Sequence, residues 1–365
     1  MTAMKRNIII VLAAALLAVS CENTVETIWS DQNEAMLVLN AQLIQDSPLH
    51  MVYVHCSEGG QNNEVLDAEV FYSKNGGAEK PVAPISHWEE WYDGSLHEEN
   101  DGYGFEETFA AGDRVTLKAR WHGLTATGEI TFPESAAKIT AVDTAKIVFT
   151  NDDGYYQTHT TRQYRITVKD KPNENNYYML RFEDVYYRLN PAGEKIASIA
   201  IDGSFDATDD HVLHPVENSM MEDLIGRDNY YETFTDEMFA DGDYTIKVTD
   251  RSWVSYGSAW HEFWYQFEEG DSYSMDRRIK VYTLTFDEYI YLRAIDAAGN
   301  DLGFMTEPVI FPGNVSGGLG FVTGVTPEIW TLEFPAEPFT GEAPINAYRY
   351  VDPQPEYDPE EPFYE

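Results

Sequence analysis

Residues 114–121 read RVTLKARW, and residues 125–132 read TATGEITF. Apolar and polar side chains alternate along both segments, as they do along a strand that buries one face. His122 and Gly123 lie between the segments, and a glycine at a tight connection favours an antiparallel hairpin. The pair therefore predicts a fold that is built mainly from β-strands.

Similar alternation precedes this hairpin at 36–44, 50–56 and 68–73, with Gly, Pro, Asn or Asp between the runs. Roughly 100 residues with strands at this spacing are typical of a small antiparallel sandwich. Residues 36–134 are therefore predicted to form an N-terminal immunoglobulin-like β-sandwich domain. The Cys–Trp–Cys pattern of true immunoglobulin domains is absent, so the prediction concerns the architecture only.

Residues 135–340 are predicted to form a larger β-rich domain with one clear helix. The helix is expected near 286–298, because Thr285 and Glu288 have the spacing of a capping box and Gly299 is a suitable end. Its apolar residues form one stripe, which is expected to pack on the sheet. Strands are expected at 138–150, 162–170, 177–189, 244–250 and 278–286.

The two ends of the chain differ from its middle. A basic start and an apolar run predict a lipoprotein signal peptide over 1–20. Cys21 follows a small residue, as in the lipobox of bacterial lipoproteins, whose cysteine is acylated; Ala18 stands where leucine is usual. The alternative is an ordinary cleaved signal with an incidental cysteine. Residues 21–35 are predicted to be an acidic tether, and residues 341–365 a Pro- and acid-rich tail.

The composition is strongly acidic, with 63 Asp and Glu against 24 Lys and Arg and a formal net charge of -39. Such a chain repels nucleic acid, so no nucleic-acid partner is expected. The acidity favours a soluble, self-repelling surface and leaves open a loose calcium site in the acidic stretch 202–210. That stretch lacks the glycine and the final glutamate of an EF-hand loop, so no metal ligand and no cofactor are assigned.

The glycine-rich segment NVSGGLGFVTG (residues 314–324) invites comparison with a nucleotide-binding loop. The dinucleotide fingerprint needs a third glycine at the position that Thr323 occupies. A Walker loop needs a lysine, which is absent, and Pro327 follows where a helix would run. The segment is therefore predicted to be a tight turn that leads into a late strand.

Aromatic residues gather in two connections, RSWVSYGSAWHEFWYQF (251–267) and SHWEEWYDG (86–94). Flat rings beside carboxylates and amides suit the binding of sugars or peptides. The alternatives are that the rings cover the core or a domain junction, or that they form a protein interface. The residues predicted to contact a ligand or partner are Trp253, Tyr256, Trp260, Trp264, Trp88 and Trp91.

No sequence motif predicts catalysis. The nucleophile elbow G-x-S-x-G is absent, and paired carboxylates carry little information in so acidic a chain. No catalytic residue is assigned, and the chain is predicted not to be an enzyme.

The order of features becomes specific in the C-terminal half. VYTLTF (281–286) runs directly into DEYIYLRAID, and EPVIFPGNVSGGLGFVTGV (307–325) follows. Earlier in the chain stand LVLNAQLIQDSP (37–48), GDRVTLKA (112–119) and a TFP exit (131–133). In this order the chain resembles DUF4249, a family of unknown function among Bacteroidota outer-membrane lipoproteins. The resemblance implies a β-rich protein on the outer membrane and implies no catalytic residues.

The resemblance also suggests a role, since such families often accompany TonB-dependent transporters. The chain is predicted to be a non-catalytic, surface-exposed lipoprotein, held in outer-membrane lipid through Cys21 and facing the cell exterior. It would capture a glycan or peptide, or act as an accessory to the transporter. The alternatives are a secreted hydrolase of polysaccharide or peptide, and a structural or adhesive surface protein.

Overall fold

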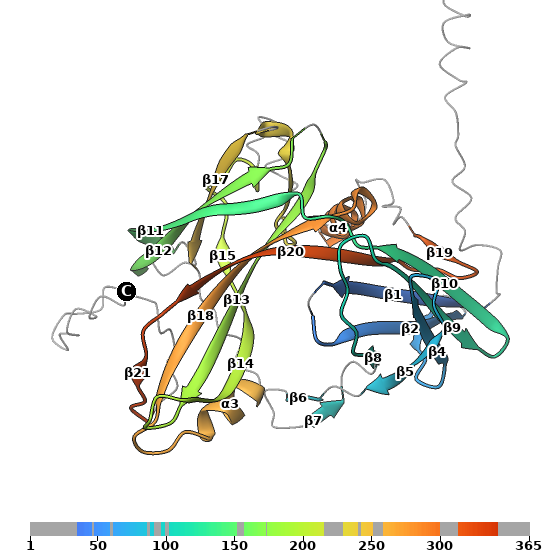
Figure 1. Ribbon diagram of the computed structural model, residues 1–365, viewed down its shortest axis with the longest axis horizontal. Helices are drawn as coiled ribbons and strands as arrows, with labels where there is room; N and C mark the ends of the chain where they lie inside the picture. Colours follow the sequence, from blue (N-terminus) through green and yellow to red (C-terminus); the bar gives the residue numbers. More distant parts are fainter. Residues whose placement is uncertain are drawn as a thin grey trace, which may run out of the picture.

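The computed structural model has a mainly β fold, which confirms the predicted fold class (Figure 1). Within the described residues it contains two α-helices, one short 3-10 helix and three β-sheets. The described residues are 35–45, 47–58, 61–85, 88–90, 96–98, 102–151, 157–172, 174–214, 229–239, 242–250, 258–299 and 313–341.

The N-terminal half consists of short strands. They are β1 (Met36–Ile44), β2 (His50–Glu58), β3 (Gln61–Glu64), β4 (Glu69–Lys74), β5 (Lys80–Ile85), β6 (Trp88–Glu90), β7 (Leu96–Glu98), β8 (Gly102–Phe105), β9 (Arg114–Trp121) and β10 (Leu124–Thr131).

The C-terminal half has longer strands and both α-helices. Its elements are β11 (Ala137–Asn151), β12 (Gln157–Asp170), β13 (Tyr177–Leu189), β14 (Lys195–Gly203), β15 (Phe205–Asp206), β16 (Thr233–Thr235), η1 (Asp236–Met238), β17 (Asp243–Asp250), α3 (Ser258–Tyr265), β18 (Ser272–Leu284), α4 (Phe286–Gly299), β19 (Val315–Ser316), β20 (Val322–Glu333) and β21 (Glu337–Pro338).

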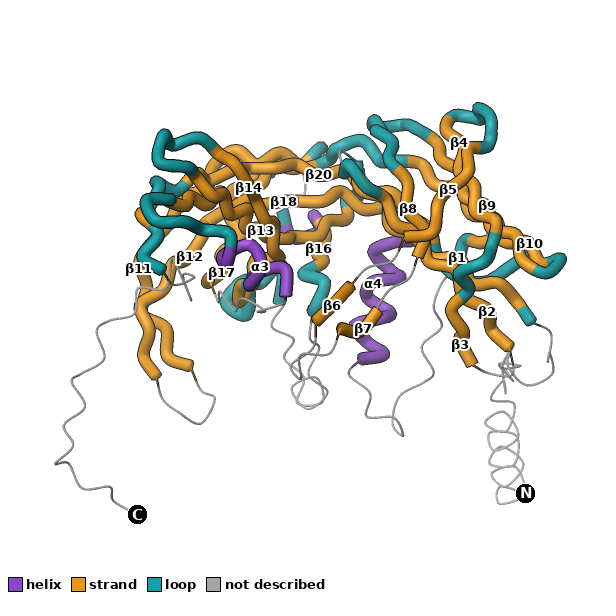
Figure 2. The backbone as a smooth tube through the Cα atoms, turned by 90° about the horizontal axis from the view of Figure 1, so that it is seen from below, coloured by secondary structure: helices purple, strands orange, loops and turns teal. Residues whose placement is uncertain are grey.

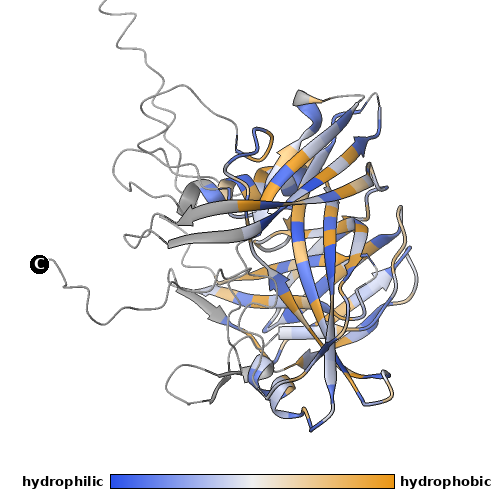
Figure 3. Ribbon diagram, turned by 90° about the vertical axis from the view of Figure 1, so that its left-hand side faces the viewer, coloured by the Kyte–Doolittle hydropathy of each residue, from blue (hydrophilic) through white to orange (hydrophobic). Residues whose placement is uncertain are grey.

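The hairpin predicted from residues 114–132 is confirmed as β9 and β10. Leu124 pairs with Trp121, and the two turn residues, His122 and Gly123, have φ angles of 46° and 85°. A two-residue turn with positive φ at both positions matches the right-handed twist of the strands that it joins. Alternate side chains of β9 and β10 enter one hydrophobic core, and Figure 3 shows the same alternation of hydropathy along many strands.

The glycine-rich segment closes the N-terminal strands into a ring. Strand β19 pairs with β10, and three residues later Leu319 forms a parallel bridge to Val38 of β1. At Gly320, φ is 111° and a Cβ would lie 2.3 Å from the carbonyl oxygen of Leu39. The segment leads into the late strand β20, as predicted, and its glycines let its backbone approach β1 closely. Neighbouring strands in the sheet follow the order β1-β2-β8-β5-β4-β9-β10-β19, and the Leu319 bridge leads back to β1. An immunoglobulin-like sandwich is not confirmed.

Strand β20 joins the two halves of the largest sheet. Val322 to Val325 pair with β1 in parallel, and Thr326 to Glu333 pair with β18 antiparallel. Figure 1 shows β20 running across the molecule from one group of strands to the other. The division into units at residues 134 and 135 stays a prediction, but strand pairing crosses it.

A second core lies between the C-terminal part of the large sheet and a four-stranded sheet in the order β11-β12-β17-β15. Arg277 of β18 lies inside this core with 1% of its surface exposed. Its guanidinium binds both carboxylate oxygens of Asp184 at 2.7 and 2.6 Å and one oxygen of Asp250 at 2.6 Å. It also donates to the hydroxyl of Tyr164 at 2.8 Å. The buried cation is therefore held by two carboxylates and one hydroxyl within the core.

The predicted helix near 286–298 is confirmed as α4. Leu292 packs with Met179, Tyr282, Leu284 and Val325 in a small core of its own. Seen from below, α4 lies between the two groups of strands (Figure 2). The short helix α3 is not expected from the periodicity, because its eight residues contain four aromatic rings, which are weak helix formers.

Candidate functional site

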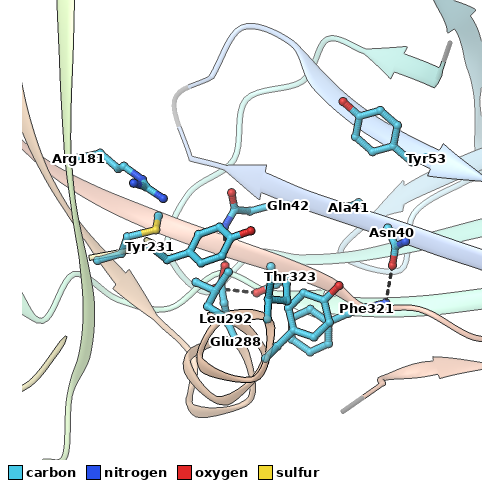
Figure 4. Close-up of a pocket in the computed structure, with 13 residues that line it drawn as sticks. Asn40, Ala41, Gln42, Tyr53, Arg181, Tyr231, Glu288, Leu292, Phe321 and Thr323 are labelled. Carbon is cyan, nitrogen blue, oxygen red and sulfur yellow. Dashed lines mark hydrogen bonds between the residues drawn. The ribbon is translucent and has the colours of Figure 1, made fainter. Parts of the chain in front are cut away.

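A cavity of about 240 Å³ lies where β1, β13, β20 and α4 meet, at the junction of the two halves (Figure 4). Its walls come from segments that are far apart in the sequence. The side chains that give it chemical character are Gln42, Tyr53, Arg181, Tyr231, Glu288 and Tyr291.

The carboxylate of Glu288 joins three of these elements. Gln42 of β1 donates to its Oε1 at 2.7 Å, and Thr323 of β20 donates to its Oε2 at 2.9 Å. Only 1% of Glu288 is exposed. Burial raises the pKa of Glu288 to about 7, although both hydrogen bonds favour the ionised form. The carboxyl group is therefore close to half-protonated at neutral pH.

The capping box expected at the start of α4 forms only in part. The hydroxyl of Thr285 accepts a hydrogen bond from the backbone N–H of Glu288 at 3.2 Å. The return bond from the Glu288 side chain is replaced by the bonds to Gln42 and Thr323. The carboxylate thus faces the junction instead of the end of its own helix.

Arg181 of β13 brings a positive charge to the cavity. Its Nη1 donates to the carbonyl of Tyr230 at 3.3 Å, and its guanidinium lies 5.6 Å from the ring centre of Tyr231. Among the residues that the structure describes, no carboxylate forms an ion pair with it. Figure 4 shows Arg181 and Tyr231 on the same side of the cavity.

Aromatic rings make up much of the remaining wall. Tyr291 stacks on Phe321 with ring centres 4.4 Å apart and an interplanar angle of 12°. Tyr53 lines the side formed by β2, and the ring of Tyr231 points towards the centre (Figure 4). Rings with polar edges, two amides and one guanidinium suit a ligand with both apolar and polar parts.

A second cavity of about 460 Å³ adjoins the first, and Gln42, Met179 and Arg181 line both. Its positive side chain Lys280 is paired with Glu183 at 2.6 Å, and Arg278 binds the other oxygen of Glu183 at 2.9 Å. Asp202 also lines this cavity and is exposed. The charges around it are therefore mixed.

Two of the predicted contact residues have a different place. Trp260 and Trp264 are only 2% and 5% exposed. Both pack edge-on against Tyr186, with ring centres 5.0 and 5.9 Å away. These two rings fill a core between α3 and the sheet, and their contact with a ligand stays a prediction. The alternative that they cover the core agrees with the structure.

No side chain is described for the other predicted site residues. Cys21, Trp91, Trp253 and Tyr256 lie outside the described residues. Trp88 belongs to strand β6, which pairs with β7, and its side chain is not described.

Two carboxylates of the acidic stretch 202–210 are used within the fold, and Asp202 and Asp209 are exposed. Asp206 accepts from the backbone and hydroxyl of Thr208 at 2.9 and 2.7 Å. Asp210, 2% exposed, accepts from the backbone of Val212 at 3.0 Å and of Lys247 at 2.8 Å. Within the described residues, no group of three His, Cys, Asp or Glu side chains is arranged to hold a metal.

The sequence analysis predicts none of the cavity residues as site residues. One feature of the sequence does distinguish Glu288. It stands four residues before Leu292, on the face of α4 that packs on the sheet. An acid within an apolar stripe is costly to bury unless it has partners. Arg181 and Tyr231 carry no comparable signal, since nothing local distinguishes them from other strand and loop residues.

In the described part of the chain, no helix has both the length and the apolar character needed to span a membrane. No curated protein matches the sequence. A solved structure of a DUF4785 family protein from Legionella pneumophila is similar at 7% identity, with a TM-score of 0.20, over 68% of this chain and 52% of that one. That similarity is too weak to support any argument. Residues 22–328 match the family model "Domain of unknown function (DUF4249)", and the chain belongs to this family.

Proposed function

We propose that this protein is a non-catalytic binding protein that captures a small glycan or peptide in the junction cavity. The observation that carries the proposal is the lining of that cavity, in which Tyr53, Tyr231 and Tyr291 occur together with one guanidinium and two amides. Tyrosine rings give contact area at low entropic cost, and the polar groups fix orientation. The absence of a nucleophile motif in the sequence favours binding over turnover.

The place of action is part of the same proposal. Acylation at Cys21 would hold the protein in the outer membrane, and the acidic tether would let the fold reach outward, facing the cell exterior. A ligand held there would pass to a TonB-dependent transporter. The support for this is the lipobox-like sequence at Cys21.

Lipidation has a direct measurement. The mature protein from membranes is expected to begin at an acylated Cys21, because the thiol follows a signal peptide and a small residue. Intact mass and N-terminal fragment spectra measure this. A mature chain that starts elsewhere, or an unmodified Cys21, contradicts the anchor. The Cys21→Ser variant is the control and should be released from the membrane fraction.

The binding proposal is tested with two defined probe mixtures, tryptic casein peptides and neutral and acidic oligosaccharides of three to six sugars. Equilibrium dialysis followed by mass spectrometry shows which compounds the purified mature protein retains. Replacement of Tyr231 by alanine is expected to weaken retention at least about tenfold, because a ring at the centre of a small cavity contributes strongly to affinity.

The matched control is Tyr265→Ala, since Tyr265 of α3 is 86% exposed and outside the cavity. This variant should bind as the unchanged protein does. Retention of no compound, or equal retention by the Tyr231→Ala variant, rejects the proposed function.

A further inference from the structure

We propose that the two adjoining cavities form one site for a ligand that carries a carboxylate, and that Arg181 binds this carboxylate. The inference rests on the proposed function and names the chemical class of the ligand. Arg181 lines both cavities, so a ligand that spans them passes its guanidinium.

The hydrogen bonds of Arg181 leave room for such a ligand. A guanidinium has five N–H donors, and within the described residues one of them is used, in the 3.3 Å bond to the Tyr230 carbonyl. The central carbon of the group lies 5.6 Å from the ring centre of Tyr231. The remaining donors are sufficient for the two parallel hydrogen bonds of a bidentate carboxylate.

The other arginines and lysines near the site are already paired. Arg278 and Lys280 share Glu183, and the deeply buried Arg277 binds Asp184 and Asp250. The chain has 63 acidic residues to supply partners. None of the described acids forms an ion pair with Arg181, although Asp296 of α4 attracts it, so the half-buried guanidinium can still accept a ligand carboxylate.

The local charge also permits an anion despite the charge of the whole chain. Glu288 faces the first cavity, and its raised pKa keeps the carboxyl partly neutral near pH 7. Glu183 in the second cavity is offset by two cations. Asp202 lines only the second cavity and repels an anion there. The carboxylate therefore belongs at the Arg181 end, and a neutral part of the ligand extends along the tyrosine rings.

A carboxylate can come from the C-terminus of a peptide or from a uronic acid in a glycan. Four probes separate these sources: N-acetyl-Leu-Phe with a free carboxylate, the same compound as its amide, trigalacturonate, and neutral maltotriose. Affinities are measured by isothermal titration calorimetry with the mature protein and with Arg181→Gln, Arg181→Lys and Arg165→Gln. Arg165 is exposed on β12 in the other sheet and is the charge-matched control.

One acidic probe is expected to bind at least about tenfold more tightly than its neutral counterpart. Arg181→Gln should abolish this preference and Arg181→Lys should keep part of it, because lysine retains the charge but not the planar pair of donors. Arg165→Gln should leave it unchanged. Melting curves establish that each variant is folded. Preference for the peptide acid or for trigalacturonate identifies the source.

Equal binding of acidic and neutral probes, or a preference that persists in Arg181→Gln, overturns this inference and leaves the proposed function standing. Failure of all four probes, when casein peptides or oligosaccharides are still retained in dialysis, also overturns the inference alone. Failure of the four probes and of both mixtures overturns the inference together with the proposed function.

Discussion

The Arg277→Met variant is expected to lose about 3 to 5 kcal/mol of unfolding free energy or to fail to fold. Methionine keeps much of the length and apolar contact of arginine but removes its charge. Asp184 and Asp250, 5% and 6% exposed, would then be buried without their cation. The Tyr164 hydroxyl would also lose its bond to the guanidinium. Urea unfolding followed by far-ultraviolet circular dichroism measures the loss.

Two further variants isolate the cause. Arg165→Met makes the same substitution on an exposed strand position and should change stability by less than about 0.5 kcal/mol. The triple variant Arg277→Met, Asp184→Asn, Asp250→Asn should regain part of the stability, since it also removes the two carboxylate charges that Arg277 binds. A stability of Arg277→Met within about 1 kcal/mol of the unchanged protein would show that the ion pairs do not support the core.

The second large effect concerns pH and Glu288. Its pKa is raised from 4.5 to about 7 in the folded protein, so the folded state holds the proton more tightly than the unfolded chain does. The contribution of Glu288 to stability is therefore fully present below pH 4.5 and is lost as the pH rises to about 7. A shift of this size corresponds to a loss on the order of 3 kcal/mol.

Glu288→Gln is expected to remove this part of the pH dependence. Glutamine can accept from Gln42 and donate to Thr323, so the junction keeps its bonds without the charge. The variant should be more stable than the unchanged protein at pH 8 and nearly equal to it at pH 4.5. Thermal and urea unfolding between pH 4.5 and 8 measure the difference between the two curves.

Other groups near Glu288 also titrate or carry charge. Asp296 on the same helix has a pKa raised to about 6, chiefly by burial, and Arg181 lines the same cavity. Both are present in either protein, so the difference between the curves isolates Glu288. Asp287→Asn, at the exposed neighbouring position, is the control and should leave the slope unchanged. If stability depends on pH in the same way for Glu288→Gln and the unchanged protein, the raised pKa of Glu288 is contradicted.

Many of the longer strands could be predicted from the sequence because their signal is local, whereas β5, β8 and β14 were not expected. Alternate residues of β1, such as Leu37, Leu39 and Leu43, are buried, as the pattern LVLNAQLI indicates. Helix α4 can be predicted for the same reason, since its N-terminal cap, its apolar stripe and its terminal glycine lie within fifteen residues of sequence. The same locality explains the hairpin of β9 and β10.

The pairing of strands and the cavity depend on distant residues. The parallel contact of β20 with β1 leaves no pattern near either strand, and without it the N-terminal strands look like a sandwich. The sequence places Trp260 and Trp264 beside polar residues, which favours a ligand site, but the fold buries both rings between α3 and the sheet. Gln42, Arg181 and Glu288 come from three elements, so only the folded chain brings them together.

The closure of the N-terminal ring has a consequence for how the chain reaches this state. The backbone N–H of Phe321 donates to the side chain of Asn40 at 2.9 Å, across 281 residues of sequence. A fragment that ends near residue 134 would contain the strands of the ring but not the segment that joins β10 to β1. Two strand edges would then stay open, and open edges are templates for aggregation. The first half of the molecule therefore gains its last strand contacts only when β19 and β20 have been made, near the end of synthesis.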